Sequence, residues 1–153
     1  MNPRRIPATT MLPAPDAARP AVSGRDRRLP LAAGKAAAGF PSPATDHVER
    51  RLDLTEYLVL HPEATFFMRV KGDSMSGAGI HDGDLLVVDR SLEPASGRVV
   101  VAALDGELTV KRLQRRQGRI TLKSENPAYP AIAVDEDRDL QIWGVVAYVV
   151  HAP

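Results

Sequence analysis

The sequence predicts a mainly β protein, with a rolled or barrel-like antiparallel β domain that follows a flexible N-terminal arm. From residue 65 onward, short runs rich in β-branched residues alternate with Gly, Pro, Asn and Asp, as short strands and turns do. Asp105-Gly106 separates two of these runs and is a strong signal for a tight hairpin. Residues 1–45 are rich in proline and show neither a helical nor a strand period, so no long helix or central strand is expected there.

The individual elements are expected in the following order. Asp53 is placed to cap a short helix over Leu54–Leu60, with Glu56 three residues later completing a capping box. Pro62 ends that helix. Strands are expected over Thr65–Val70, Asp84–Val88, Arg98–Leu104, Glu107–Leu113, Arg119–Lys123, Ala131–Val134 and Leu140–Val150. Many short strands with little helix favour an antiparallel β architecture.

Composition limits the classes of protein that the chain can represent. Its 153 residues allow one domain, or a smaller domain with a tail. The chain has no cysteine, which excludes disulfides and thiolate metal sites and is compatible with a reducing cytoplasm. The four histidines have a spacing that suits no metal site, so neither a metal nor a cofactor is expected.

Charge and hydropathy limit the partners. The net charge is +1, but residues 1–38 are basic and the remainder is mildly acidic, so a basic footprint for nucleic acid over the whole protein is absent. No apolar run approaches the roughly 18–20 residues that span a bilayer. A stretch from Arg25 to Phe40 faintly resembles a signal peptide, but Lys35 and Pro30 interrupt it.

The loop Gly72-Asp73-Ser74-Met75-Ser76-Gly77 is the first candidate site. It follows directly after an expected strand, and its small residues leave room for another backbone to approach. Successive amides in such a turn can point into one concavity and stabilise an oxyanion. Gly, Asp and Ser are also ordinary turn formers, so the loop alone does not distinguish a nucleophile from a structural turn.

Lys111 is the second candidate, on the second strand of the expected hairpin. It shares a strand face with Thr109 and Leu113 and lies among apolar residues. To act as a base near neutral pH, a lysine needs its pKa lowered from about 10.4 to roughly 7, which burial can achieve. A neutral lysine beside a serine hydroxyl is a working nucleophile–base pair without histidine. The alternative is a strand-end lysine that extends into water.

A third segment supplies a possible substrate. Ala36–Pro43 reads AAAGFPSP, which is uncharged and made mostly of small residues. The prolines favour an extended backbone. A segment of this kind, around the bond Ala38-Gly39, fits a narrow active-site cleft.

These segments together carry a resemblance to a known family. The order of an Ala-Gly bond, GDSM, DGDLLVVD, DGELTVKRL and SENPAYP resembles the LexA/UmuD family of self-cleaving Ser–Lys proteins. The resemblance covers Gly39 to about Ala152. It implies the LexA/UmuD-type rolled antiparallel β domain.

The resemblance also implies roles for individual residues. Ser74 matches the nucleophile, Lys111 matches the general base, and Ala38-Gly39 matches the bond that is cut. The backbone amides of Asp73 and Ser74 match the oxyanion hole. A turn with a structural role is implied at the family's NP-x-Y pattern, which here comprises Asn126, Pro127 and Tyr129.

A function in the SOS response to DNA damage follows from the resemblance. A filament of RecA on single-stranded DNA would stimulate self-cleavage, which divides the chain into an arm, 1–38, and a peptidase-like β domain, 39–153. The processed form would dimerise and join a UmuC-like Y-family DNA polymerase in error-prone translesion synthesis, in the cytoplasm.

Three other functions are weighed against this one. A LexA-like self-cleaving repressor needs an N-terminal helix-turn-helix of roughly 60 residues, and the proline-rich residues 1–38 do not predict one. A membrane signal peptidase with the same residue pair needs a membrane anchor, and no apolar run of the sequence is long enough to form one. In a non-catalytic β binding module, Ser74 and Lys111 would be incidental.

Overall fold

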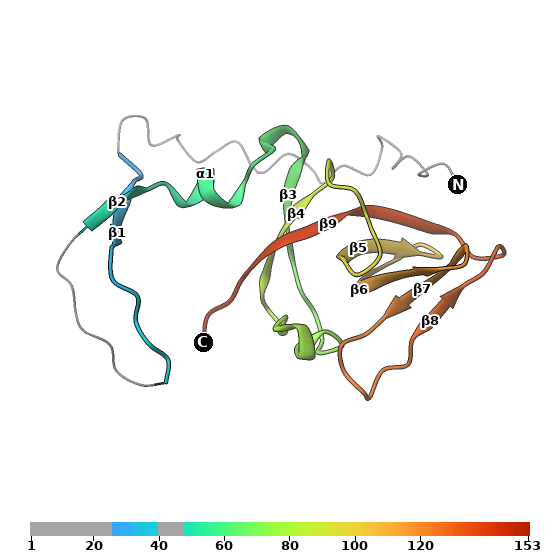
Figure 1. Cartoon of the computed structure of the whole chain (residues 1–153). Coiled ribbons are helices and arrows are strands. Elements are labelled where there is room, and N and C mark those ends of the chain that lie inside the picture. Colours follow the sequence, from blue (N-terminus) through green and yellow to red (C-terminus); the bar gives the residue numbers. More distant parts are fainter. Residues whose placement is uncertain (1–25, 40–47) are drawn as a thin grey trace. The chain divides into compact units, whose positions relative to one another are not determined.

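The computed structural model describes residues 26–39 and 48–153. These fall into two compact units, which are described separately: residues 26–39 with 48–60, and residues 61–153. The elements of both are labelled in Figure 1. Of the predicted arm, residues 1–38, the first 25 residues lie outside the described part of the chain. The predicted boundary between residues 38 and 39 is the point where cleavage would divide the chain, and it stays a proposal.

The first unit holds a small sheet and a helix. Strand β1 (Leu29–Ala32) pairs antiparallel with β2 (Val48–Leu52), and α1 (Leu54–Leu58) follows. The Asp53 side chain accepts hydrogen bonds from the amides of Thr55 and Glu56, which confirms the predicted helix cap. The helix ends two residues before the predicted end, because Val59 adopts extended backbone.

The two strands of this first unit are a correction to the sequence prediction. The sequence predicts a flexible arm over residues 1–45 and no strand over β1 or β2. Strand β1 contains Pro30, which removes a backbone donor, but a two-stranded sheet consists only of edge strands and tolerates proline there. A four-residue strand of this kind leaves almost no pattern in the sequence.

The second unit is a seven-stranded antiparallel sheet, with short 3-10 turns at Pro62–Ala64 and Ser76–Ala78. Its strands are β3 (Thr65–Arg69), β4 (Leu85–Asp89), β5 (Val99–Leu104), β6 (Glu107–Arg116), β7 (Arg119–Lys123), β8 (Ile132–Val134) and β9 (Leu140–Val150). The order across the sheet is β3-β4-β9-β5-β6-β7-β8. The mainly β prediction is confirmed, and all seven predicted strands are present.

The β5–β6 hairpin forms where the sequence predicts it. Asp105 and Gly106 have φ values of 51° and 85°, which are the left-handed conformations that a type I′ turn requires. Strand β6 continues to Arg116, three residues beyond the predicted end, because it also pairs with β7. This hairpin fixes which residues of β6 face the interior.

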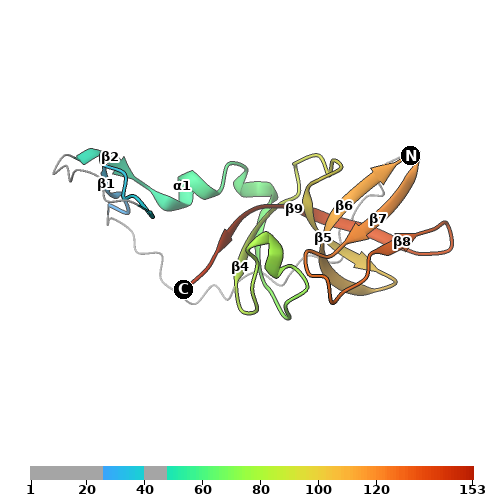
Figure 2. The same cartoon turned by 60° about the horizontal axis from the view of Figure 1, so that its bottom comes forward.

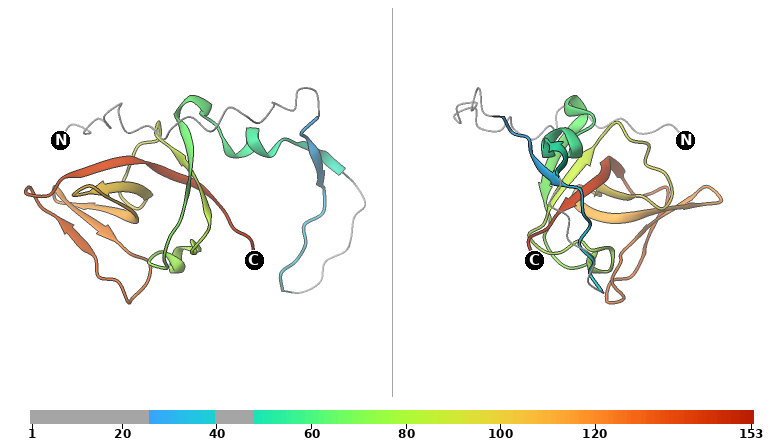
Figure 3. Two further views of the ribbon diagram at one scale, coloured as in Figure 1. Left: turned by 180° about the vertical axis from the view of Figure 1, so that it is seen from behind. Right: turned by 60° about the vertical axis from the view of Figure 1, so that its left-hand side comes forward.

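Strand β9 joins the two halves of the sheet. Its first part pairs with β5 and its last part pairs with β4, with a register shift in each ladder. Figure 2 shows β4 on one side of β9 and β5 to β8 on the other, and Figure 3 shows β9 as one long strand across this unit. Strand β9 packs tightly against β4 at Gly144, since an added Cβ there would lie 2.7 Å from Val88 Cγ1.

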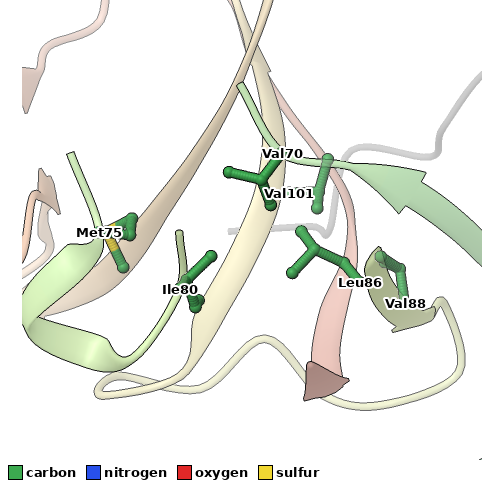
Figure 4. Close-up of a cluster of buried hydrophobic side chains, with 6 residues drawn as sticks. All are labelled: Val70, Met75, Ile80, Leu86, Val88 and Val101. Atoms are coloured by element: carbon green, nitrogen blue, oxygen red, sulfur yellow. The ribbon is translucent and has the colours of Figure 1, made fainter. Parts of the chain in front are cut away.

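The apolar residues of this unit form two clusters. One of them includes Leu86, Val88 and Val101 with Met75 and Ile80 from the loop between β3 and β4, as Figure 4 shows. The other packs β5, β6, β7 and β9 together through Val100, Ala102, Leu104, Leu113, Leu122 and Val145. The described residues with buried polar or charged side chains are Asp84, Asp89 and Lys111.

Candidate active site

The loop that carries Ser74 is held by the core on one side and by the segment around Glu125 on another. Met75, the next residue, is 2% exposed and anchors the loop in the core (Figure 4). The amide of Glu125 donates to the Ser74 carbonyl oxygen at 2.9 Å, and the Gly77 amide donates to the Glu125 carbonyl oxygen at 2.7 Å. A Cβ at Gly77 would overlap that carbonyl oxygen. The small residues of this loop therefore allow close backbone contact with the segment after β7.

Lys111 comes to this loop from the middle of β6, where it pairs with Val100. It is only 7% exposed. Its Nζ donates to Ser74 Oγ at 2.9 Å and to the Val110 carbonyl oxygen at 3.3 Å. The structure thus brings together two candidate residues that lie 37 positions apart in the sequence.

Burial changes the acidity of the lysine. Desolvation lowers the pKa of Lys111 below its ordinary value of 10.5, because a buried site disfavours the charged ammonium. Once deprotonated, the amine offers a lone pair to the Ser74 hydroxyl across the same contact. A lysine in this state can accept the serine proton, whereas an exposed lysine remains charged near neutral pH.

Asp73 and its partners shape the turn next to the serine. The Asp73 carbonyl oxygen accepts hydrogen bonds from Asn126 Nδ2 at 3.0 Å and from the Ser76 amide at 3.2 Å. Tyr129 Oη donates to Asp73 Oδ1 at 2.6 Å, and this contact raises the pKa of Tyr129. With the carbonyl oxygen and the side chain of Asp73 both engaged, the turn has a fixed orientation. An oxyanion role for the amides of Asp73 and Ser74 stays a prediction.

The predicted cleavage site lies in the other compact unit. Ala38 and Gly39 are both exposed and belong to neither β1 nor β2. An added Cβ at Gly39 would have no neighbour within 4 Å among the described atoms. Residues 40–43 of the predicted substrate segment lie outside the described residues.

Two histidines have structural partners that the sequence did not reveal. His61 Nδ1 lies 2.6 Å from Asp89 Oδ2, and His151 Nδ1 lies 2.6 Å from Asp84 Oδ1. Both contacts are structural and involve no metal ligand set among the described residues. The paired residues are 28 and 67 positions apart, so no local pattern connects them.

Two further features are absent from the described residues. Within residues 26–39 and 48–153, no group of three His, Asp or Glu side chains is arranged to hold a metal ion. The same residues contain no helix whose length and apolar character would let it cross a membrane.

The antiparallel β unit holds a buried lysine that is hydrogen-bonded to a loop serine, a geometry that can support nucleophilic chemistry without histidine. Comparison with known proteins identifies the family. The family model described as Peptidase S24-like matches residues 30–147, and the chain belongs to this family.

Three relatives illustrate the range of similarity. The chain is 51% identical to SamA of Salmonella typhimurium strain LT2 over 122 residues, which cover 80% of this chain and 84% of that protein. It is 46% identical to MucA of Escherichia coli over 127 residues, which cover 82% of this chain and 86% of that protein. It is 40% identical to the LexA repressor of Bordetella petrii over 147 residues, covering 93% of this chain and 65% of that protein.

These findings confirm the predicted resemblance to the LexA/UmuD family. MucA is a UmuD homologue, and the family match together with these relatives supports a self-cleaving, serine peptidase-like protein of the SOS group. The fold expected from the resemblance, a LexA/UmuD-type antiparallel β domain, is the fold observed.

Proposed function

We propose that this chain cuts itself once, between Ala38 and Gly39, with Ser74 as nucleophile and Lys111 as general base. The observation that carries the proposal is the 2.9 Å contact between Lys111 Nζ and Ser74 Oγ, at a lysine whose pKa is lowered by burial. Membership of a family of self-cleaving peptidases supports the same chemistry.

The proposed reaction has two halves. The neutral Lys111 amine takes the Ser74 proton while Oγ attacks the Ala38 carbonyl carbon, and the amides of Asp73 and Ser74 stabilise the oxyanion. Lys111 then gives its proton to the departing amine of Gly39, which leaves an ester between Ser74 and Ala38. In the second half, Lys111 deprotonates a water molecule that attacks this ester and restores the free serine.

The biological setting is proposed from the relatives. Their similarity to this chain, and the UmuD homology of MucA, favour stimulation of cleavage by a RecA filament on single-stranded DNA. The processed form, residues 39–153, would act as a homodimer with a UmuC-like Y-family DNA polymerase in the cytoplasm. Residues 1–38 are the part that cleavage removes.

A LexA-like repressor is the second candidate. The 40% identity to the Bordetella petrii repressor over 93% of this chain favours it. A repressor would bind one operator sequence much more tightly than unrelated DNA of equal length. A titration of both DNAs with the purified chain separates the two functions, since a polymerase accessory subunit would show no such preference.

Self-cleavage is tested with the purified full chain. It is incubated with activated RecA filament, and separately at alkaline pH alone, and the products are weighed by mass spectrometry. We expect one cut after Ala38 and a rate that rises with pH as Lys111 deprotonates. Ser74→Ala and Lys111→Ala abolish the cut under both conditions. An intact wild-type chain under both conditions refutes the proposal.

Lys123→Ala is the matched control for the lysine. Lys123 is exposed at the end of β7, so its loss removes one positive charge without touching Ser74. We expect this variant to cleave at the wild-type rate. The polymerase partnership is tested separately, by co-purification of the cleaved protein with a Y-family polymerase, and its failure would leave the chemistry intact.

A further inference from the structure

Ser124 directly follows β7, close to Lys111. The β6–β7 ladder ends with the pair Arg112 and Lys123, and an extension of this register by one residue would bring Ser124 opposite Lys111. Side chains that oppose each other directly across an antiparallel pair share one face. Ser124 and Lys111 line the same hollow of about 540 Å³, together with Thr109 and Tyr129.

The Ser124 hydroxyl is buried without a partner. Its Oγ has no hydrogen-bond partner among the described residues. Lys111 does not serve it, because the hydrogen bonds of Lys111 Nζ go to Ser74 Oγ and to the Val110 carbonyl oxygen. Buried polar atoms are normally satisfied, so an orphan hydroxyl on a residue that lines a hollow leaves one hydrogen bond for a group in the hollow to make.

The neighbouring backbone fixes where this hydroxyl lies. Glu125, the next residue, donates from its amide to the Ser74 carbonyl oxygen and accepts from the Gly77 amide. Ser124 is therefore tied to the loop of Ser74 through a single peptide unit. A group hydrogen-bonded to Ser124 Oγ is positioned relative to the Ser74–Lys111 pair.

We propose that Ser124 is a substrate-binding residue whose hydroxyl bonds a backbone group of the segment around Ala38-Gly39 during cleavage. This inference rests on the proposed function. The segment suits the role, because its alanines are exposed and lie outside β1 and β2, so their backbone groups are not committed to a sheet. A hydroxyl both donates and accepts, and one such bond helps to orient the scissile carbonyl toward Ser74 Oγ.

The test measures the self-cleavage rate of the full chain from neutral to alkaline pH, at one protein concentration, with thermal unfolding measured in parallel. Ser124→Ala is expected to lower the plateau rate about fivefold, as the loss of one neutral hydrogen bond does. The pH midpoint stays at its wild-type value, because the Ser124 hydroxyl makes no hydrogen bond to Lys111. Ser124→Thr, which retains a hydroxyl, restores most of the rate.

Thermal unfolding distinguishes substrate binding from a structural role. A hydroxyl without a partner adds nothing to the folded state, so Ser124→Ala leaves the melting temperature unchanged or raises it. Ser96→Ala is the control, because Ser96 Oγ accepts a hydrogen bond from the Arg115 amide and does not line this hollow. We expect it to cleave at the wild-type rate.

Three results would overturn the inference: a wild-type rate in Ser124→Ala, a slower rate accompanied by a lower melting temperature, or a shifted pH midpoint with an unchanged plateau. The last result would mean that Ser124 acts on Lys111 rather than on the substrate. The proposed function fails differently, through an uncut wild-type chain or continued cleavage in Ser74→Ala.

Discussion

At the scale of single residues, Lys111 illustrates the conflict between stability and chemistry. Its side chain is buried in the sheet, and burial lowers its pKa. An amine held in this state costs folding free energy, because the unfolded chain can keep the lysine charged and solvated. The same burial makes Lys111 a base that becomes neutral at a lower pH than a free lysine does.

The first prediction follows from this cost. Lys111→Met should raise the free energy of unfolding near pH 7 by about 1 kcal/mol, since an apolar side chain of similar length suits a buried site better. The variant should not cleave. Urea unfolding with circular dichroism measures the change.

The pH dependence has a defined sign. Between the lowered pKa of the folded state and 10.5, the unfolded chain binds one more proton than the folded chain at Lys111. The contribution of this residue to stability therefore rises with pH across that interval. The advantage of Lys111→Met over the wild type should shrink as the pH rises, and a constant or growing advantage would contradict this.

Tyr129 gives a second prediction at the residue scale. Tyr129→Phe removes the 2.6 Å hydrogen bond to Asp73 Oδ1 and retains the ring. The turn before Ser74 then loses one constraint, and the cleavage rate should fall about threefold to tenfold, as the loss of one hydrogen bond does. Cleavage assays with product mass detection measure this. An unchanged rate would show that the contact with Asn126 is sufficient to hold Asp73.

At the scale of elements, the site depends on where two loops meet. The loop after β3 carries Ser74, and the segment after β7 carries Glu125, whose backbone binds both Ser74 and Gly77. Strand β6 supplies the lysine from between these loops. The Ser74–Lys111 pair is therefore set by the packing of three separate segments.

Gly77 provides the prediction at this scale. In Gly77→Ala, the new Cβ would overlap the Glu125 carbonyl oxygen, so the two loops must separate. We expect a loss of about 1–3 kcal/mol in the free energy of unfolding and slower cleavage, because Ser74 shifts relative to Lys111. Ser76→Ala, in the same turn, adds no atoms and should have a small effect. Equal stability of the two variants would contradict the close contact.

At the scale of the whole β unit, residues 61–153, both ends of its chain attach to the same strand. His61, at its beginning, contacts Asp89, the last residue of β4. His151, just after β9, contacts Asp84, the residue before β4. Two contacts over long sequence separations thus hold the two ends of β4.

Asp84→Asn tests this arrangement. The His81 amide and the His151 side chain both lower the pKa of Asp84, so its carboxylate stabilises the fold above the unfolded value of 3.8 and loses this effect as pH falls through the lowered folded pKa. The melting temperature of Asp84→Asn should lie below that of the wild type at pH 6. The difference should close at lower pH, as scanning calorimetry can show. A difference that does not vary with pH would contradict a role for the charge.

Much of the fold was predictable because its signals are local. The seven strands of the second unit are bounded by turn residues, and Asp105-Gly106 adopts the backbone that its sequence predicts. The strands β1 and β2 were missed, because short edge strands with a proline leave no period. The extension of β6 was missed as well, because it depends on pairing with β7 rather than on its own residues.

The sequence alone determined the order of strands and turns, the helix cap at Asp53 and the candidate residues Ser74 and Lys111, because these depend on residue type and local spacing. Only the tertiary structure decided that Lys111 Nζ lies 2.9 Å from Ser74 Oγ, that the lysine is buried, and that Ser124 faces the same hollow. Contacts of this kind join segments far apart in the chain, and they arise from sheet register and from the packing of loops against a common core.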